Sequence, residues 1–176
     1  MRERARLGMA MFLVNEAVFF FLLIAAFVYF RSSTLAAAAG ALRLGPAAVY
    51  TACLLASSCT MRGAQRGKPA RARVWMGATM ALGGVFLLGQ GREYLLLFHQ
   101  NVTIGNSLFG TTFFTLTGLH GLHVAAGIAL LGILSAPAGD SSERQSVAID
   151  TAALYWYFVD AVWIAIFVVL YLWTLL

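Results

Sequence analysis

Five long apolar stretches dominate this chain and constrain its fold more than any other feature. They cover approximately residues 9–30, 44–65, 74–98, 107–134 and 151–175, and each reaches the roughly 20 residues that a helix needs to cross a bilayer. Of the 176 residues, 61% are hydrophobic and only 11% are charged, too few to give a soluble domain a polar surface. The sequence therefore predicts an all-α membrane protein, a single domain over residues 1–176 built as a bundle of five transmembrane helices.

The positive charges are distributed unevenly between the two sides of such a bundle. Nine Lys and Arg residues fall on the side of the N-terminus, namely Arg2, Arg4, Arg6, Arg62, Arg66, Lys68, Arg71, Arg73 and Arg144. Three fall on the opposite side, namely Arg31, Arg43 and Arg92. Because cytoplasmic loops carry the excess of Lys and Arg, this bias predicts a cytoplasmic N-terminus and an outside C-terminus. The net charge of +5 is interpreted as a topology signal and a contact for lipid headgroups, not as a nucleic-acid surface.

Ionisable residues inside the predicted spans are costly and need a structural or functional reason. They are Glu16, Glu93, His120, His123 and Asp160. With a rise of 1.5 Å per residue, Glu16, Asp160 and His123 lie about 10, 13 and 16 Å from the cytoplasmic ends of their spans. A carboxylate surrounded by lipid needs a partner to stay charged, so we expect Glu16 to pair with His123 or His120. Arg92 and Glu93 are expected to form a pair at the outer interface.

Three interpretations remain open for this buried polar group of Glu16, His120, His123 and Asp160. Metal or haem ligation is suggested by His120 and His123, which share a helix face, but the one other histidine, His99, lies in an outer loop. The same groups could relay protons through the bundle, or they could satisfy one another and fix the helices in place. We predict no metal site, no bound redox cofactor and no catalytic residue in this chain, whose loops are too short for an extramembrane redox domain.

Two further patterns predict which helix faces meet lipid or protein. Aromatic residues gather at both ends of the last span, as in the belts found at membrane interfaces, and these are Tyr155, Trp156, Tyr157, Tyr171 and Trp173. Mostly small residues form one stripe of the fourth span, which favours close approach of a neighbouring backbone, and these are Thr111, Thr115, Gly118, Leu122 and Ala125.

Four ordered motifs resemble those of the cytochrome c oxidase subunit III family, the third subunit of haem-copper terminal oxidases. In chain order they are MAMFLVNEAVFF at residues 9–20, the Gln-x-x-Glu-Tyr pattern of Gln90, Glu93 and Tyr94, FGTTFFTLTGLHGLHVAAG at 109–127, and YWYFVDAVW at 155–163. Glu16 stands at the place of the family's membrane glutamate. Two positions depart from the family pattern, because Asn15 stands where Ser is usual and Tyr157 where His is usual.

The resemblance implies a subunit that binds no redox centre and lies against the catalytic subunit, subunit I, near the mouth of a proton-uptake channel on the cytoplasmic side. There it would support proton uptake and protect the active centre during turnover. Haems and copper are expected in partner subunits, with subunit II, small subunits and phospholipids as further partners, in a bacterial plasma membrane. The reduction of dioxygen to water with proton pumping would belong to the complex as a whole. Either cytochrome c or quinol would be its electron donor.

Longer family members have seven helices in two groups around a lipid-filled cleft, whereas this chain resembles the last five, as bacterial short forms do. Such a cleft would need another subunit to complete it. The alternatives within the family are an accessory protein of a nitric oxide reductase or of a quinol oxidase. The alternative from a different class is a stand-alone small membrane transporter or proton channel.

Overall fold

The computed structural model describes residues 2–30, 43–67, 69–106, 108–136 and 142–172, and this part of the chain contains no strand. Five of its helices are long and apolar enough to cross a membrane. They are α1 (Arg2–Tyr29), α3 (Leu44–Arg66), α4 (Pro69–His99), α5 (Leu108–Ser135) and α6 (Ser142–Phe167). A π-helical segment, Val168–Leu172, continues α6. The predicted all-α bundle of five spanning helices is confirmed.

Three helices begin well before the apolar stretches that predicted them. Helix α1 begins at Arg2, α4 at Pro69 and α6 at Ser142, whereas the apolar stretches begin at residues 9, 74 and 151. Arg, Ala, Glu and Gln, which fill these first turns, are good helix formers, and a helix can continue from the hydrocarbon core into the polar headgroup layer. The predicted end of the last span at residue 175, and the charges of Arg31 and Lys68, lie outside the described residues.

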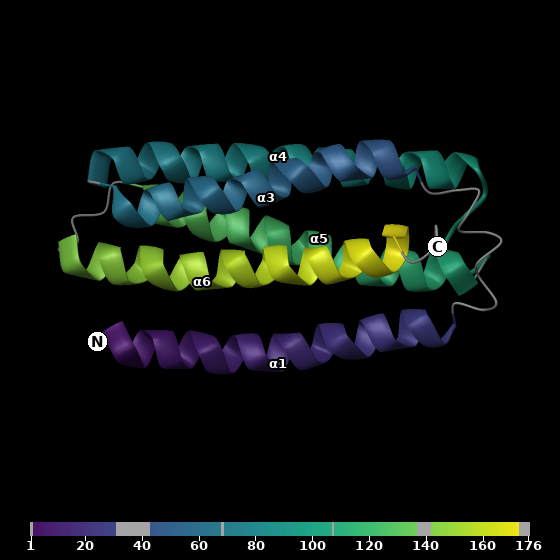
Figure 1. Ribbon diagram of the computed structural model, residues 1–176, viewed down its shortest axis with the longest axis horizontal. Helices are drawn as coiled ribbons and strands as arrows, with labels where there is room; N and C mark the ends of the chain where they lie inside the picture. Colours follow the sequence, from purple (N-terminus) through teal and green to yellow (C-terminus); the bar gives the residue numbers. More distant parts are fainter. Residues whose placement is uncertain (1, 31–42, 68, 107, 137–141, 173–176) are drawn as a thin grey trace.

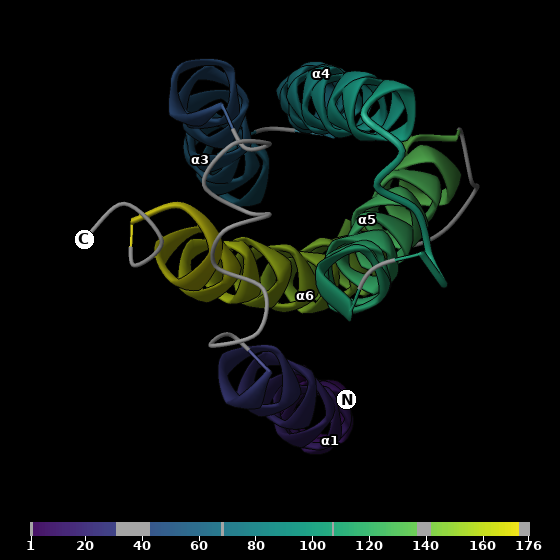
Figure 2. The ribbon, with the colours of Figure 1, turned by 90° about the vertical axis from the view of Figure 1, so that its right-hand side faces the viewer.

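Four of the helices form a closed ring, and the fifth lies outside it. Seen along the bundle, α3, α4, α5 and α6 follow one another around the ring, with α6 in contact with α3 (Figure 2). Helix α1 lies against the outside of the ring, where it contacts α6 and α5. Consecutive helices run antiparallel, so the N-terminal ends of α1, α4 and α6 meet the C-terminal end of α3 at one end of the bundle (Figure 1).

The interior of the ring centres on Trp156 of α6, whose side chain is only 1% exposed. Its ring fits against Gly83 of α4 and Gly127 of α5, since a Cβ atom at either glycine would lie 2.9 Å from a carbon of the indole. Its Nε1–H donates to Oγ of Ser57 on α3 at 2.8 Å. One side chain therefore contacts the other three helices of the ring, and the prediction that Trp156 anchors α6 at the headgroups is wrong.

The other aromatic residues assigned to the membrane interface are also involved in the fold. Tyr155 is buried, and its hydroxyl donates to the backbone carbonyl of His123 at 2.9 Å. The hydroxyl of Tyr157 donates to Oε1 of Gln65 at 2.8 Å, and buried Tyr171 donates to Glu93 at 2.7 Å. Trp173 lies outside the described residues. Each described hydroxyl bonds to another helix. These tyrosines therefore connect helices and do not serve only as anchors at the membrane interface.

The small-residue stripe of α5 does not face the ring. Thr115, Leu122 and Ala125 are exposed along it. The face of α5 that packs inside carries larger residues, among them Phe113, Leu116, Thr117, His120, Val124 and Leu131. Wide side chains fill the space inside a ring of four helices better than small ones, so the bulky face turns inward. No described helix of this chain covers Thr115, Leu122 and Ala125, so the expectation that the stripe faces protein stays a prediction, and it concerns a partner subunit.

Gly89 of α4 gives a direct test of the contact between α3 and α4. A Cβ atom at this position would lie 2.3 Å from Cγ of the Tyr50 ring on α3. We expect Gly89→Ala to destabilise the protein by about 1–3 kcal/mol, because the ring is held close to its own backbone and cannot move away freely. The thermal midpoint of the purified protein in detergent would measure the loss.

A matched control lies on the same helix. Gly84→Ala makes the same chemical change where nothing lies within 4 Å of the new Cβ, so it should be neutral or slightly stabilising. Replacing Tyr50 by Ala should relieve the effect of Gly89→Ala, since it removes the clashing ring. Equal effects at Gly84 and Gly89 would contradict the close contact.

Candidate functional site

A carboxyl and an imidazole group meet at the middle of the bundle. Glu16 lies near the middle of α1 and His123 near the middle of α5. Oε2 of Glu16 is 3.1 Å from Nε2 of His123. Their side chains are 17% and 19% exposed, so the pair lies at the boundary between α1 and the ring and not deep inside it. The structure therefore brings Glu16 together with His123.

The second ring nitrogen of His123 defines how protons are arranged in this pair. Nδ1 is 2.8 Å from the backbone carbonyl oxygen of Leu119. A carbonyl can only accept, so Nδ1 carries a hydrogen and donates it. Nε2 then either carries a second hydrogen and donates to a Glu16 carboxylate, or is bare and accepts from a protonated Glu16. In both cases the pair is neutral overall and shares one proton along the line from Oε2 to Nε2.

The surroundings of the pair restrict how the imidazole can move. The ring of Phe20 on α1 meets His123 edge-on, with 5.0 Å between the ring centroids. Tyr155 of α6 binds the carbonyl of the same histidine. Helices α1, α5 and α6 thus meet at this point, where His123 is held between a carboxyl group and its own helix backbone. The arrangement can hold a proton and pass it along the Glu16 contact.

His120 points to a different place from His123. It is fully buried, and neither ring nitrogen has a hydrogen-bond partner among the described residues. Its ring stacks on Trp163 with 4.9 Å between the centroids and lies edge-on to Phe86 at 5.8 Å. His120 therefore belongs to an aromatic cluster inside the ring, whereas His123 faces α1.

Asp160 forms its hydrogen bond with a serine of α3 and not with either histidine. It is buried in the middle of α6, and Ser58 of α3 donates a hydrogen bond to its Oδ2. Oδ1 is buried without a hydrogen-bond partner in the described part of the chain. No hydrogen bond or ion pair of the described residues joins Asp160 to Glu16, and no group of three or more His, Cys, Asp and Glu there could hold a metal ion.

Glu93 is engaged with another helix and not with its neighbour in sequence. The hydroxyl of Tyr171, in the π-helical segment, donates to Oε2 of Glu93 at 2.7 Å. Within the described ranges no ion pair forms between Arg92 and Glu93. Nearby, Nε2 of Gln90 donates to the carbonyl oxygen of Thr117 at 2.6 Å. The Gln-x-x-Glu-Tyr motif thus joins α4 to α5 and α6.

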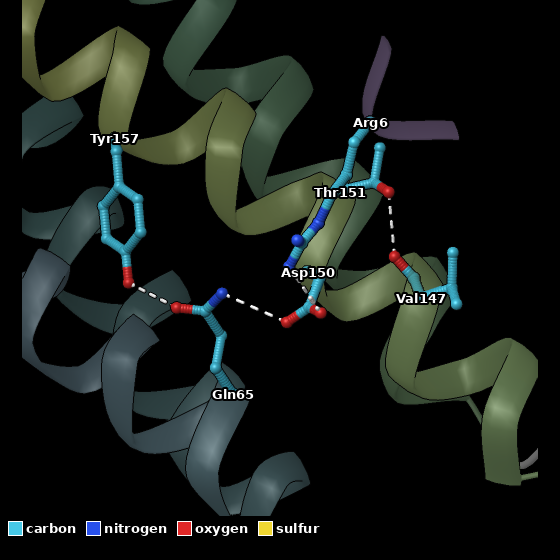
Figure 3. Close-up of polar contacts among 6 residues, drawn as sticks. All are labelled: Arg6, Gln65, Val147, Asp150, Thr151 and Tyr157. Carbon is cyan, nitrogen blue, oxygen red and sulfur yellow. Dashed lines mark hydrogen bonds and ion pairs between the residues drawn. The ribbon is translucent and has the colours of Figure 1, made fainter. Parts of the chain in front are cut away.

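A polar network at the N-terminal end of α1 is not evident from the sequence. Arg6 forms an ion pair with Asp150 at 3.2 Å, although 144 positions separate the two residues. Nε2 of Gln65 also donates to Asp150 at 3.2 Å, and Gln65 accepts from Tyr157 (Figure 3). The apolar stretch of the last span begins after Asp150, so the sequence places this residue in a loop, whereas it lies in the third turn of α6.

Comparison with known proteins agrees with this architecture. The family model described as "Cytochrome c oxidase subunit III" matches residues 1–175. The chain belongs to this family. It is 37% identical to cytochrome c oxidase subunit 3 of Synechocystis sp. over 175 residues, covering 94% of this chain and 74% of that protein. It is 34% identical to cytochrome c oxidase subunit 3 of Corynebacterium diphtheriae over 177 residues, covering 93% and 85%.

A third relative is named after a different electron donor, ubiquinol. The cytochrome bo(3) ubiquinol oxidase subunit 3 of Pseudomonas aeruginosa is 37% identical over 130 residues, which cover 70% of this chain and 62% of that protein. The family membership inferred from the four motifs is confirmed. The protein is a subunit III of a haem-copper terminal oxidase and a multi-pass protein of the plasma membrane.

Proposed function

We propose that this subunit supports proton uptake by the catalytic subunit I and protects it during turnover, while subunits I and II hold the haems and copper. The observation that carries the proposal is the Glu16–His123 pair, whose Oε2 and Nε2 atoms lie 3.1 Å apart near the middle of two spanning helices. Gain or loss of a proton would leave such a pair with a net charge, which is costly in lipid, so this step requires a polar partner beside the pair. Its position between α1 and the ring, partly exposed, leaves it accessible to a partner subunit.

The charge distribution supports a cytoplasmic position for the end of the bundle that holds Arg6 and Asp150. The N-terminal ends of α1, α4 and α6 and the C-terminal end of α3 lie together there (Figure 1), and the sequence places arginines at each of these ends. Cytoplasmic segments of membrane proteins carry the excess of Lys and Arg. In this orientation the subunit would present its polar network to the side from which a terminal oxidase draws protons.

Isolation of the native complex through an affinity tag on this chain tests the proposal. We expect haem absorbance in the reduced-minus-oxidised spectrum, together with subunits I and II. An unrelated multi-pass protein with the same tag, purified from the same membranes, is the control for haem proteins carried over. A complex without haem would contradict the proposal and would favour a stand-alone transporter or proton channel.

The electron donor is a separate question, and the similarity to a subunit of a ubiquinol oxidase favours quinol as a second candidate. The identity to this relative, 37%, equals that to the Synechocystis subunit, so both cytochrome c and quinol are candidate donors. Oxygen consumption by the purified complex with reduced cytochrome c or with a quinol would decide between the two. Reduction of nitric oxide instead of oxygen would identify a nitric oxide reductase.

A further inference from the structure

A small cavity lies inside the ring, next to the Gln-x-x-Glu-Tyr motif of α4. Its volume of about 10 Å³ reaches the lower limit at which a cavity can hold one water molecule. Its polar lining comes from α4, from α5 and from the π-helical segment, and consists of Gln90, Glu93, Tyr94, Thr117 and Tyr171. A cavity with several polar groups suits a water molecule, whereas a purely apolar cavity stays dry.

The hydrogen bonds around Gln90 fix which way its amide group points. Nε2 donates to the backbone carbonyl oxygen of Thr117 at 2.6 Å and to the hydroxyl of Tyr94 at 2.8 Å. Turning the amide over would place Oε1 against the Thr117 carbonyl, and two acceptors cannot bond to each other. The hydroxyl of Thr117 donates to the carbonyl of Phe113 at 2.7 Å, so Tyr94 donates its own hydrogen to Oγ1 of Thr117 at 2.8 Å. These three side chains therefore leave no hydrogen for Oε1 of Gln90.

Oε1 of Gln90 is a buried acceptor without a donor in the described part of the chain. The side chain is only 9% exposed, and Oε1 lies against α5, since a Cβ atom at Gly121 would be 3.1 Å from it. Buried polar atoms nearly always have a hydrogen-bond partner, and ordered water commonly provides the one that the protein does not. Glu93 offers a second acceptor in the same cavity, because a carboxyl group keeps lone pairs free after its Oε2 accepts from Tyr171.

A second cavity lies between this site and the surface. It has a volume of about 20 Å³ and shares two lining residues with the first, Tyr50 and Glu93. Its lining also includes the exposed residues Arg43 and Arg92, so water from this end of the bundle needs to pass only the two shared side chains. Two arginines against one acidic residue give this lining a net positive charge, which disfavours the entry of a metal cation.

We propose that the inner cavity binds one water molecule, which donates hydrogen bonds to Oε1 of Gln90 and to the carboxyl group of Glu93. The water supplies the donor that Gln90 needs and completes the hydrogen bonds of the Gln-x-x-Glu-Tyr motif. Gln90 bonds to α5 and Glu93 to the π-helical segment, so the water connects the contacts of α4 with both neighbours. The lining of this site includes no residue of α1, so the site is separate from the proton-linked role proposed for Glu16 and His123.

Cryo-electron microscopy of the intact purified complex, at a resolution that shows ordered water, tests the site. We expect a density peak inside the ring at hydrogen-bond distance, about 2.5–3.0 Å, from Oε1 of Gln90 and from the carboxyl group of Glu93. A map that shows other buried waters but no peak here would overturn the proposal. A peak surrounded by six or more oxygen atoms at about 2.3–2.6 Å would overturn it too, since it would be a cation.

Two variants test whether the peak depends on the acceptor and on the space around it. Gln90→Met keeps the length of the side chain but removes the amide oxygen, and the peak should be lost. Ala47→Val keeps every polar group of the lining but adds two methyl groups at the cavity wall, and the peak should be lost again. Ala64→Val, the same change at a buried alanine near the other end of α3, is the control and should leave the peak in place. A peak that persists in either variant, or that disappears with Ala64→Val, would contradict this water site.

Discussion

Replacing Trp156 by Ala is expected to destabilise the protein by about 3–5 kcal/mol, the usual cost of removing a large buried aromatic side chain. The indole fills the centre of the ring and touches glycines of α4 and α5. It also bonds to Ser57 of α3. The substitution therefore removes contacts with three helices at once. Unfolding in detergent, followed by helical content, would measure the loss, and the amount of the subunit in purified complexes should fall with it.

Trp75→Ala is the matched control, since it makes the same substitution at a side chain that is 41% exposed. Its effect should be clearly smaller. Trp156→Phe keeps most of the ring but removes the hydrogen bond to Ser57, and the expected cost is about 1–2 kcal/mol. If Trp75→Ala and Trp156→Ala were equally costly, Trp156 would not be the centre of the packing.

The five spans could be predicted from the sequence because a bilayer imposes one simple requirement. A chain that crosses it must satisfy its backbone hydrogen bonds within each segment, so apolar stretches of sufficient length become helices. Hydropathy, however, indicates depth along a helix and not which way the helix is turned. The sequence therefore predicts a small-residue stripe on α5, but it does not predict that Thr115 and Leu122 point away from the other described helices of this chain.

The position at which a helix begins determines the depth predicted for its aromatic and acidic residues. Apolar residues predict a start near residue 151, which places Trp156 at a headgroup layer and Asp150 in a loop. The helix begins nine residues earlier, at Ser142, so Trp156 lies near the middle of α6 and Asp150 faces Arg6 and Gln65. Helix-forming polar residues in a headgroup layer leave no hydropathy signal.

The partner of Glu16 also depends on how a helix is rotated, which hydropathy does not indicate. Comparable depth predicted contact with His120 or His123 but did not choose between them. Residues three apart on a helix differ by about 60° in direction, so a small rotation of α5 decides which one faces α1. Packing of aromatic rings around His120 sets that rotation and leaves His123 for Glu16.

A double-mutant cycle with Glu16→Leu and His123→Leu is expected to give a coupling energy of about 2 kcal/mol for this pair. Each single variant leaves one polar group at membrane depth without its ionic partner, whereas the double variant removes both. The stability of the purified protein in lipid nanodiscs would provide the four free energies. The exposed pair Glu3→Leu and His99→Leu is the control, with an expected coupling near zero.

Glu16→Gln separates the structural part of this pair from its proton. The amide of Gln can donate to a bare Nε2 of His123, so the hydrogen bond between α1 and α5 can persist and the complex should assemble normally. The amide cannot accept or release the shared proton. If the pair supports proton uptake, the assembled Glu16→Gln complex should lose activity sooner during turnover than the complex with Glu3→Gln. Normal assembly with unchanged turnover would contradict a role in proton uptake. The pair would then be purely structural, because Gln retains the hydrogen bond but not the proton.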